Sequence, residues 1–244
     1  MSNVRREGSI VFTEDDHKYV NEKTGEEYIS VTTLIKKYET EFPKEKIAAA
    51  IGKRNGRDPR EIITEWENIA KEATDYGTKV HNLMERYILV NGVYTPADDF
   101  ERDILDAYQK NKSINFSGKT IAEQLVYLKS LKLAGQSDII DLIGSEYFDL
   151  SDWKTNKVIN YYSKYDNWFK APLGHLSQCE YNIYGLQLST YAYMYEKMSG
   201  RKCRRISLVH YNKNFNVFKQ IPINYMKFEV MSMLKHYRDN FLEK

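Results

Sequence analysis

The sequence predicts a mixed α/β fold, with a central sheet flanked by helices, from the order of its periodic segments. Residues 43–110 carry apolar positions at helical spacing, and three strand-like runs follow between residues 120 and 153. A helix, two strands and a last helix complete the chain. With 244 residues, no internal repeat and no low-complexity linker, one domain is expected. In it, residues 1–74 elaborate a core formed by residues 75–244.

The N-terminal elaboration is expected to contain a β-hairpin and helices. Residues 9–30 hold strand-like runs at 10–12, 18–20 and 28–29, with a turn at 21–25 before the last run, which predicts the hairpin. Ser30 is a suitable N-cap for a short helix that reaches about Tyr38. Further helices are predicted over residues 43–53, 59–73, 75–90 and 97–110, the last two leading into the core.

The core is expected to contain five strands and two helices. Ser177 to Glu180 fits a Ser-x-x-Glu capping box and predicts a helix that runs to about Met198. Glycine at 135 is expected to permit a tight hairpin, and glycine at 77 a close approach at a helix start. The predicted strands are residues 120–128, 133–142, 147–153, 204–211 and 215–223, and the last helix is 224–242.

The composition excludes several classes of protein. The 36 basic and 34 acidic residues give a net charge of +2, so nucleic-acid binding would need a local basic patch. No apolar run approaches the roughly 20 residues of a membrane span, and residues 1–14 lack the apolar core of a signal peptide. Two cysteines are too few for a four-cysteine zinc or iron–sulfur site. A cytoplasmic location without membrane contact is therefore expected.

Two carboxylates in the strand-like runs are the first indication of chemistry. Asp138 lies inside one run and Asp152 near the end of the next, and carboxylates are costly to bury there without a cation. Lys154 follows Asp152 by two positions, so both side chains point to the same face of a strand. Such a set suits phosphodiester hydrolysis with Mg²⁺ or Mn²⁺. In it, Lys154 would orient or deprotonate the attacking water, or stabilise the charge of the transition state. A lone Asp-x-Lys is, however, commonly only a surface ion pair.

The surrounding residues narrow this choice, because they occur as four motifs in one order. Leu-Ala-Gly-x-x-Asp at 133–138 is followed by Asp-Trp-Lys-Thr at 152–155. Upstream stands Gly-Thr-Lys-Val-His at 77–81, and downstream Gln-x-x-x-Tyr at 187–191. Together these resemble the RecB-type exonuclease branch of the PD-(D/E)XK nuclease superfamily, over roughly residues 75–211. Residues 19–34 also resemble bacteriophage members and the mitochondrial genome maintenance exonuclease.

The resemblance implies a restriction-endonuclease-like core and a role for each motif residue. His81, Asp138 and Asp152 are implied as metal ligands, and Lys154 as the catalytic cation. Glu123, in the preceding strand, is implied as a further catalytic residue. Taken alone, His81 suits the margin of a core and Glu123 a strand edge. Gln187 and Tyr191 lie on one helical face and are implied to touch the DNA backbone or the Lys154 region; they also suit ordinary helix packing.

Two segments carry basic and aromatic residues that suit single-stranded DNA. After Lys154, lysines are interleaved with aromatic residues. The lysines would supply charge for phosphates, and the aromatic rings would stack on bases. The alternative is an aromatic mini-core under a long loop. The second segment is a basic run around Arg204 and Arg205, which also suits a solvated turn. The candidate DNA-binding residues are Lys157, Tyr161, Tyr162, Lys164, Tyr165, Trp168, Arg204 and Arg205.

The expected function is a Mg²⁺- or Mn²⁺-dependent DNA exonuclease of phage or related origin. It would act from single-stranded ends in replication, recombination or DNA turnover, with recombination or replication proteins as possible partners. Helices within residues 30–75 and the aromatic loop are expected to wall a channel for one strand. A structure-selective endonuclease and a catalytically silent DNA-binding module are the alternatives. No Walker phosphate loop is present, so no nucleotide cofactor is expected.

Overall fold

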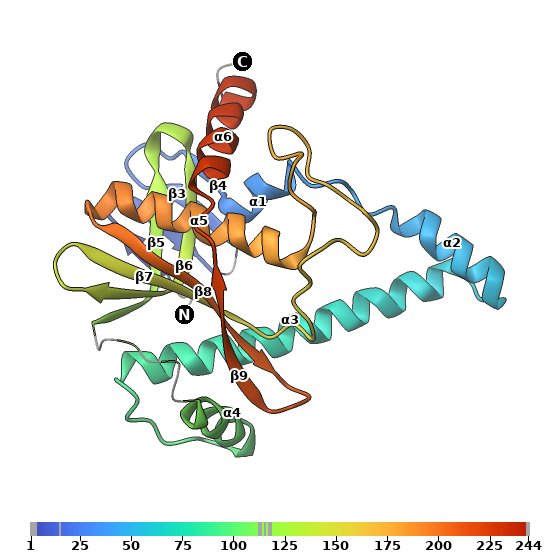
Figure 1. Ribbon diagram of the computed structural model, residues 1–244, viewed down its shortest axis with the longest axis horizontal. Helices are drawn as coiled ribbons and strands as arrows, with labels where there is room; N and C mark the ends of the chain where they lie inside the picture. The colour runs from blue at the N-terminus through green and yellow to red at the C-terminus, as the bar shows by residue number, and fades with distance from the viewer. Residues whose placement is uncertain (1–3, 15, 112–113, 115, 117–118, 243–244) are drawn as a thin grey trace.

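The computed structural model describes residues 4–14, 16–111, 114, 116 and 119–242. It confirms the predicted mixed α/β architecture, with a central mixed sheet flanked by helices (Figure 1). The strands are β1 (Val4–Glu7), β2 (Ile10–Thr13), β3 (Lys18–Asn21), β4 (Glu27–Ser30), β5 (Thr120–Leu128), β6 (Leu133–Ile143), β7 (Tyr147–Lys154), β8 (Lys202–Asn212) and β9 (Val217–Ile223). The helices are α1 (Val31–Lys36), α2 (Lys44–Asn55), α3 (Pro59–Leu89), α4 (Asp99–Lys110), α5 (Glu180–Ser199) and α6 (Lys227–Tyr237). A 3-10 turn, η1 (Lys129–Leu131), and a π-helical turn, η2 (Arg238–Leu242), complete the assignment.

The sheet is continuous from the N-terminal strands to the C-terminal ones. Its order is β1-β2-β3-β4-β6-β7-β8-β9, and β5 pairs with β6 beside this path. Two pairings are parallel, β4 with β6 and β7 with β8, and the others are antiparallel. The N-terminal residues therefore share one sheet with the rest of the chain.

Helices cover both faces of the central strands. On one face α1, α5 and α6 pack against β5 to β8, with Leu186, Leu188 and Ala192 of α5 fully buried. On the other, the C-terminal part of α3 packs with α4 around the indole of Trp153. A smaller cluster joins the N-terminal strands to β5 and β6. Figure 1 shows α5 lying across the sheet.

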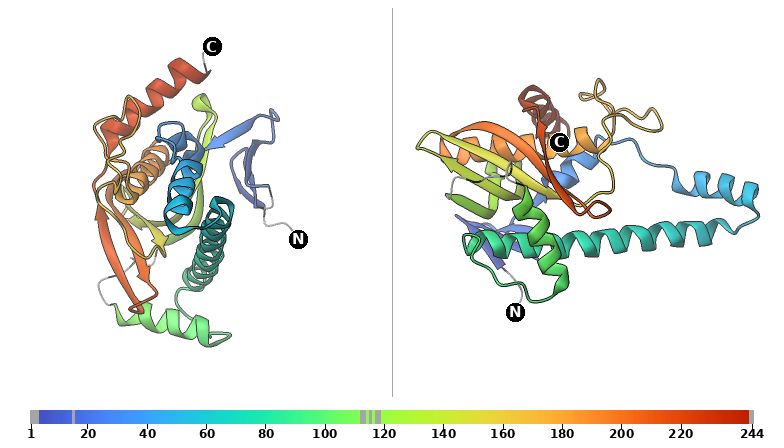
Figure 2. Two further views of the ribbon diagram at one scale, coloured as in Figure 1. Left: turned by 90° about the vertical axis from the view of Figure 1, so that its right-hand side faces the viewer. Right: turned by 60° about the horizontal axis from the view of Figure 1, so that its bottom comes forward.

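A long arm projects from this body. The helix α2 and the N-terminal half of α3 extend side by side away from the sheet, as both views in Figure 2 show. The structure corrects the prediction of two helices here, since α3 runs unbroken from Pro59 to Leu89 and crosses the expected boundary at residue 74. Gly77 lies inside this helix, and its missing side chain makes room for Thr155, whose Oγ1 is 3.1 Å from where a Cβ would lie.

Three further predictions about the elements were wrong in detail. The expected N-terminal hairpin is a four-stranded meander, because β1 adds the polar segment Val4–Glu7 by backbone pairing with β2. The capping box is not formed: α5 begins after Cys179 without a side-chain cap, and the Ser177 hydroxyl accepts instead from Ser163 N. The last helix begins at Lys227 rather than 224. Ser30 caps α1 as predicted, accepting from Thr33 N at 2.9 Å.

Within the described residues, no helix combines the length and the apolar character that crossing a bilayer requires.

Candidate active site

The residues predicted to act in catalysis lie at a fork in the sheet, where β4 and β7 diverge along one edge of β6. Along one edge of β6, β4 pairs as far as Ala134 and β7 pairs from Ile139, which leaves residues 135–138 between the two ladders. Beyond its pair with Ile139, β7 leaves β6 and continues beside β8 to Lys154. Asp138 lies in this gap, and the amide of Trp153 donates to its Oδ2 at 3.0 Å. The two strands that carry the candidate carboxylates are therefore joined at the fork.

Asp152 and Lys154 form a buried ion pair on the α5 side of this fork. Lys154 Nζ donates to Asp152 Oδ2, and the two side chains are 15% and 4% exposed. The ammonium also lies 4.7 Å from the ring centroid of Tyr184 in α5. The predicted same-face arrangement is confirmed, because the intervening Trp153 points to the opposite face, into the core beneath α4.

Burial and mutual repulsion govern the charges of this pair. Burial and the nearby Asp138 carboxylate raise the pKa of Asp152 to about 6, although Lys154 opposes the shift. Burial also lowers the pKa of Lys154, but Asp152 and Asp138 outweigh that effect and leave it raised. Lys154 is therefore a stable cation in this arrangement.

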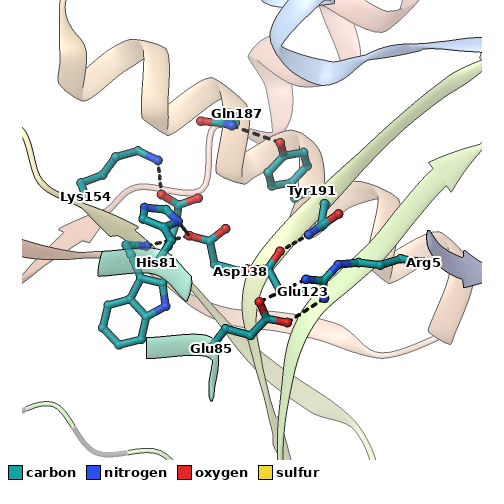
Figure 3. Close-up of polar contacts among 11 residues, drawn as sticks. Arg5, His81, Glu85, Glu123, Asp138, Lys154, Gln187 and Tyr191 are labelled. Carbon is teal, nitrogen blue, oxygen red and sulfur yellow. Dashed lines mark hydrogen bonds and ion pairs between the residues drawn. The ribbon is translucent and has the colours of Figure 1, made fainter. Parts of the chain in front are cut away.

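The helix α3 brings a third group to the fork. His81 Nδ1 lies 3.2 Å from Asp138 Oδ2, on the same oxygen that accepts from Trp153 N. One turn further along α3, Glu85 lies on the same face of the helix as His81, and its carboxylate contacts Arg5 (Figure 3). The close approach at Gly77 lets α3 pass near the end of β7 and so places His81 against Asp138.

Glu123 occupies a strained position in β5 beside these residues. Its backbone φ is +52°, a left-handed conformation that is unusual for a glutamate inside a strand. The carboxylate accepts from Gln136 Nε2. Burial and the Asp138 charge raise the pKa of Glu123 to about 8. Glu123 is thus one of a group of crowded carboxylates, and the simple strand edge considered as its alternative does not describe it.

Gln187 and Tyr191 lie on the side of α5 that faces the fork. Gln187 Nε2 donates to the Tyr191 hydroxyl at 3.0 Å. The Tyr191 ring is buried over Gly135, and a Cβ at residue 135 would lie 2.4 Å from Tyr191 Cε1. Gly135 lies within β6, where it makes room for this ring. Its predicted role in a tight hairpin turn is therefore wrong. Tyr191 is enclosed by protein, and its hydroxyl fixes the amide of Gln187.

The candidate DNA-binding residues separate into two places. Those of the segment 157–168 are all exposed, which argues against the aromatic mini-core; Tyr162 is 80% and Trp168 47% exposed. Lys157 lines a hollow of about 630 Å³ that begins at Thr155, next to Lys154. Arg204 instead pairs with Asp149 on the other face of the sheet. Arg205 lines a separate hollow there with Asp149. The structure does not bring these two arginines to the fork.

Four further residues at the fork were missed by the sequence prediction. Glu85 follows His81 by four positions, and Tyr184 precedes Gln187 by three, so helical spacing gave a signal for both. Gln136, which donates to Glu123, lies two residues before Asp138. Arg5 binds Glu85 from 80 residues away in sequence, and no local pattern marks that contact.

The carboxylate and imidazole groups of the site are suitable ligands for a hard divalent cation, although the carboxylate oxygens contact other protein groups in this structure. Among the described residues, no three His, Cys, Asp or Glu side chains are arranged as they would be around an ion. The reason is visible in the contacts, since Lys154 holds Asp152 and His81 and Trp153 N hold Asp138. Several buried carboxylates in one place nevertheless leave uncompensated negative charge, which a cation relieves.

Comparisons with known proteins identify no family for this chain. No family model matches the sequence, and no curated protein does either. Among solved structures, the chain is similar to a protein of Eubacterium rectale named "Putative exonuclease". The TM-score is 0.40 at 9% identity, over 88% of this chain and 80% of that one. A likeness this distant does not identify an activity, so function has to be inferred from the residues of the site.

Proposed function

We propose that the chain is a divalent-metal-dependent nuclease of the PD-(D/E)XK type that hydrolyses phosphodiester bonds in DNA. The main support is the convergence of Asp138, Asp152 and Lys154 at the fork between β6 and β7, with His81 of α3 against Asp138. Two carboxylates and an imidazole are suitable ligands for Mg²⁺ or Mn²⁺. The ammonium beside them suits a substrate whose reacting group is an anionic phosphate.

Each residue of the site would have a separate role in metal binding or catalysis. Asp138 and Asp152 would hold the cation, with His81 as a further ligand and Glu123 nearby. When bound, such an ion supplies charge neutralisation and activation of water. Lys154, whose pKa is raised by the facing carboxylates, would present a fixed positive charge to the phosphate and orient the attacking water. Gln187, held by Tyr191, would line the side of the site formed by α5.

The exposed aromatic loop beside the site supports a single strand as the substrate. The loop 155–179 leaves β7 at the site and lies on the same side of the molecule as the arm (Figure 1). It is held to the segment before α2, where Thr40 N donates to Gln178 Oε1 at 2.7 Å and Phe42 lies 6.0 Å from Tyr165 between ring centroids. The exposed rings of the loop would stack on bases while its lysines contact phosphates. We propose that this loop and the arm wall the path of one strand.

Digestion of labelled linear and circular single-stranded DNA tests this function. We expect the linear substrate to be degraded with Mg²⁺ or Mn²⁺, the circle to survive, and EDTA to stop the reaction. Cleavage of the circle at the rate of the linear strand would make the protein an endonuclease with the same site. Absence of cleavage with either metal, on single- and double-stranded DNA, would overturn the proposal.

A further inference from the structure

A tyrosine of α5 lies against the lysine of the candidate site. The ammonium of Lys154 is 4.7 Å from the centroid of the Tyr184 ring, and it also donates to Asp152. An ammonium over an aromatic ring is attracted by the negative charge of the ring face, and the attraction is stronger where water is excluded. The Lys154 side chain is only 15% exposed. The ring is therefore a second restraint on this ammonium, beside the carboxylate.

The Tyr184 side chain is itself tied to the strand that carries Lys154. Its hydroxyl donates to Oδ1 of Asn156 at 3.0 Å, and Asn156 follows Lys154 by two positions. The carbonyl oxygen of Asn156 accepts in turn from His210 Nε2 at 2.6 Å. His210 is buried in β8, where it is the pairing partner of Lys154. Tyr184 is thus held at its hydroxyl while the face of its ring contacts the ammonium.

The two restraints on Lys154 differ in what else they are expected to bind. Asp152 is proposed as a metal ligand, so its oxygens would serve both the cation and the ammonium. A hard divalent cation takes oxygen ligands, and the face of an aromatic ring is not one of them. The contact with Tyr184 is therefore compatible with any partner of the Asp152 carboxylate. A lysine has a flexible stem and gains most from a restraint of this kind.

We propose that Tyr184 is a positioning residue that holds the ammonium of Lys154 where the phosphate would dock. It precedes Gln187 by three positions and lies outside the Gln-x-x-x-Tyr motif at 187–191. A lysine free to leave this place would face the phosphate for only part of the time, which lowers turnover more than substrate binding. This role in turnover rests on the proposed function, whereas the placement of the ammonium does not.

The placement can be measured without catalysis, by nuclear magnetic resonance of the intact, metal-free protein labelled with carbon-13 at the ε-carbon of lysine. The ring current of Tyr184 should move the ε-protons of Lys154 upfield, and Lys154→Arg identifies this signal by removing it. We expect Tyr184→Leu to return the signal to the usual lysine position and Tyr184→Phe to keep it upfield. The upfield shift should also persist when Mg²⁺ is added.

The role in turnover is tested by the kinetics of the same variants. We expect Tyr184→Leu to lower kcat about tenfold with KM within about twofold. Tyr184→Phe should recover most of this loss, to within about threefold of the unchanged protein, because it keeps the ring and removes only the bond to Asn156. In a Lys154→Ala background, Tyr184→Leu should change the single-turnover rate by less than about twofold, since its effect passes through Lys154.

The matched control is another lysine–tyrosine contact on the same helix. Tyr193 is also partly buried in α5, and Lys197 Nζ lies 5.4 Å from the centroid of its ring. Tyr193 follows Tyr184 by nine residues, about two and a half turns. Tyr193→Leu should therefore leave both the Lys154 signal and kcat unchanged.

Several outcomes would overturn the role of Tyr184. These are a usual ε-proton position in the unchanged protein, loss of the shift on adding Mg²⁺, and an unaltered kcat in Tyr184→Leu. Equal rate losses with and without Lys154 would make Tyr184 a merely structural residue. If the unchanged protein cleaves no DNA but shows a shift that Tyr184→Leu removes, the proposed function is wrong and the placement of the ammonium by Tyr184 stands.

Discussion

At the scale of single residues, Lys154 shows how position determines chemistry. Burial disfavours a charged amine, yet Asp152 and Asp138 face Lys154 closely enough to keep its pKa raised. An amine with a raised pKa is a poor proton acceptor and a good fixed cation. A fixed positive charge at this place agrees with the electrostatic role proposed for Lys154.

We predict that Lys154→Ala reduces nuclease activity by about 10²–10³-fold or more, because one preorganised charge near a reacting phosphate contributes that much. The measurement is the initial rate on labelled DNA in saturating Mg²⁺, with circular dichroism to check folding. Lys235→Ala is the matched control, since Lys235 pairs with Asp239 at the exposed end of α6. An active Lys154→Ala variant would remove this lysine from the mechanism.

How much of the site was predictable depends on where each residue lies in sequence. Asp152 and Lys154 are two positions apart on one strand, so parity alone predicted their common face. His81 and Glu123 were predicted from the resemblance, but their contacts depend on how α3 and β5 pack. Arg5 was not predictable, because its contact with Glu85 exists only once β1 has joined the sheet. Arg204 and Arg205 were predicted from a basic run in the sequence, but they lie on the face of the sheet opposite to the site. The sequence did not show on which face that run would lie.

At the scale of elements, the contact between β6 and α5 is set by one glycine. The Tyr191 ring fills the space that a side chain at residue 135 would need. We predict that Gly135→Ala lowers the free energy of unfolding by about 1–3 kcal/mol, the usual cost of overpacking. Gly174→Ala is the control, because its added Cβ would meet only Phe169 O at 3.6 Å. Equal urea midpoints for the two variants would show that Tyr191 moves aside freely.

A second prediction concerns the connection between α3 and α4. The buried Glu101 carboxylate accepts from Ala97 N at 2.7 Å, Tyr94 Oη at 3.1 Å and Arg86 Nη2 at 2.7 Å. We predict that Glu101→Gln lowers the free energy of unfolding at neutral pH by about 1–3 kcal/mol, because a charged acceptor of three bonds is lost. The control is Glu65→Gln, whose pair with Arg57 is exposed and should contribute little.

The pH dependence of this contribution has a definite sign. The hydrogen bond from Ala97 N is the largest cause that lowers the pKa of Glu101, and Arg86 adds to it. The carboxylate therefore stabilises the fold fully above the ordinary pKa of glutamate. That stability is lost as the pH falls through the lowered pKa of the folded state. Denaturant unfolding at neutral and acid pH should show the Glu101→Gln penalty shrinking in acid, and a penalty that grows there would contradict this assignment.

The order of the elements was largely predictable, and the errors have physical causes. The strands β5, β6 and β7 agree with their predicted ranges to within a residue, because apolar residues and turn residues act locally there. The predicted break in α3 was wrong because Gly77, interpreted as a helix start, lies inside the helix. There its missing side chain leaves room for Thr155. The polar strand β1 was missed because its pairing with β2, and not its own composition, makes it a strand.

At the scale of the whole molecule, the loop 155–179 is a surface with several exposed rings beside the site. We predict that Tyr162→Ala and Trp168→Ala each weaken binding of single-stranded DNA by about 1–3 kcal/mol, the value of one stacked base. Fluorescence anisotropy with a labelled oligonucleotide, in EDTA and at fixed salt, measures this. Phe228→Ala is the control, since Phe228 is 75% exposed on α6. Equal losses for all three variants would exclude stacking on the loop.

The unbroken course of α3 has a mechanical consequence. At about 1.5 Å per residue, the tip of the arm lies about 27 Å from Gly77, and His81 lies about 6 Å beyond it on the other side. Val80, Leu83 and Met84, which follow Gly77 closely, are fully buried, so the core holds firmly the part of α3 that carries His81. The tip of the arm and the imidazole are therefore two points on one continuous helix that is anchored in the core at the site end.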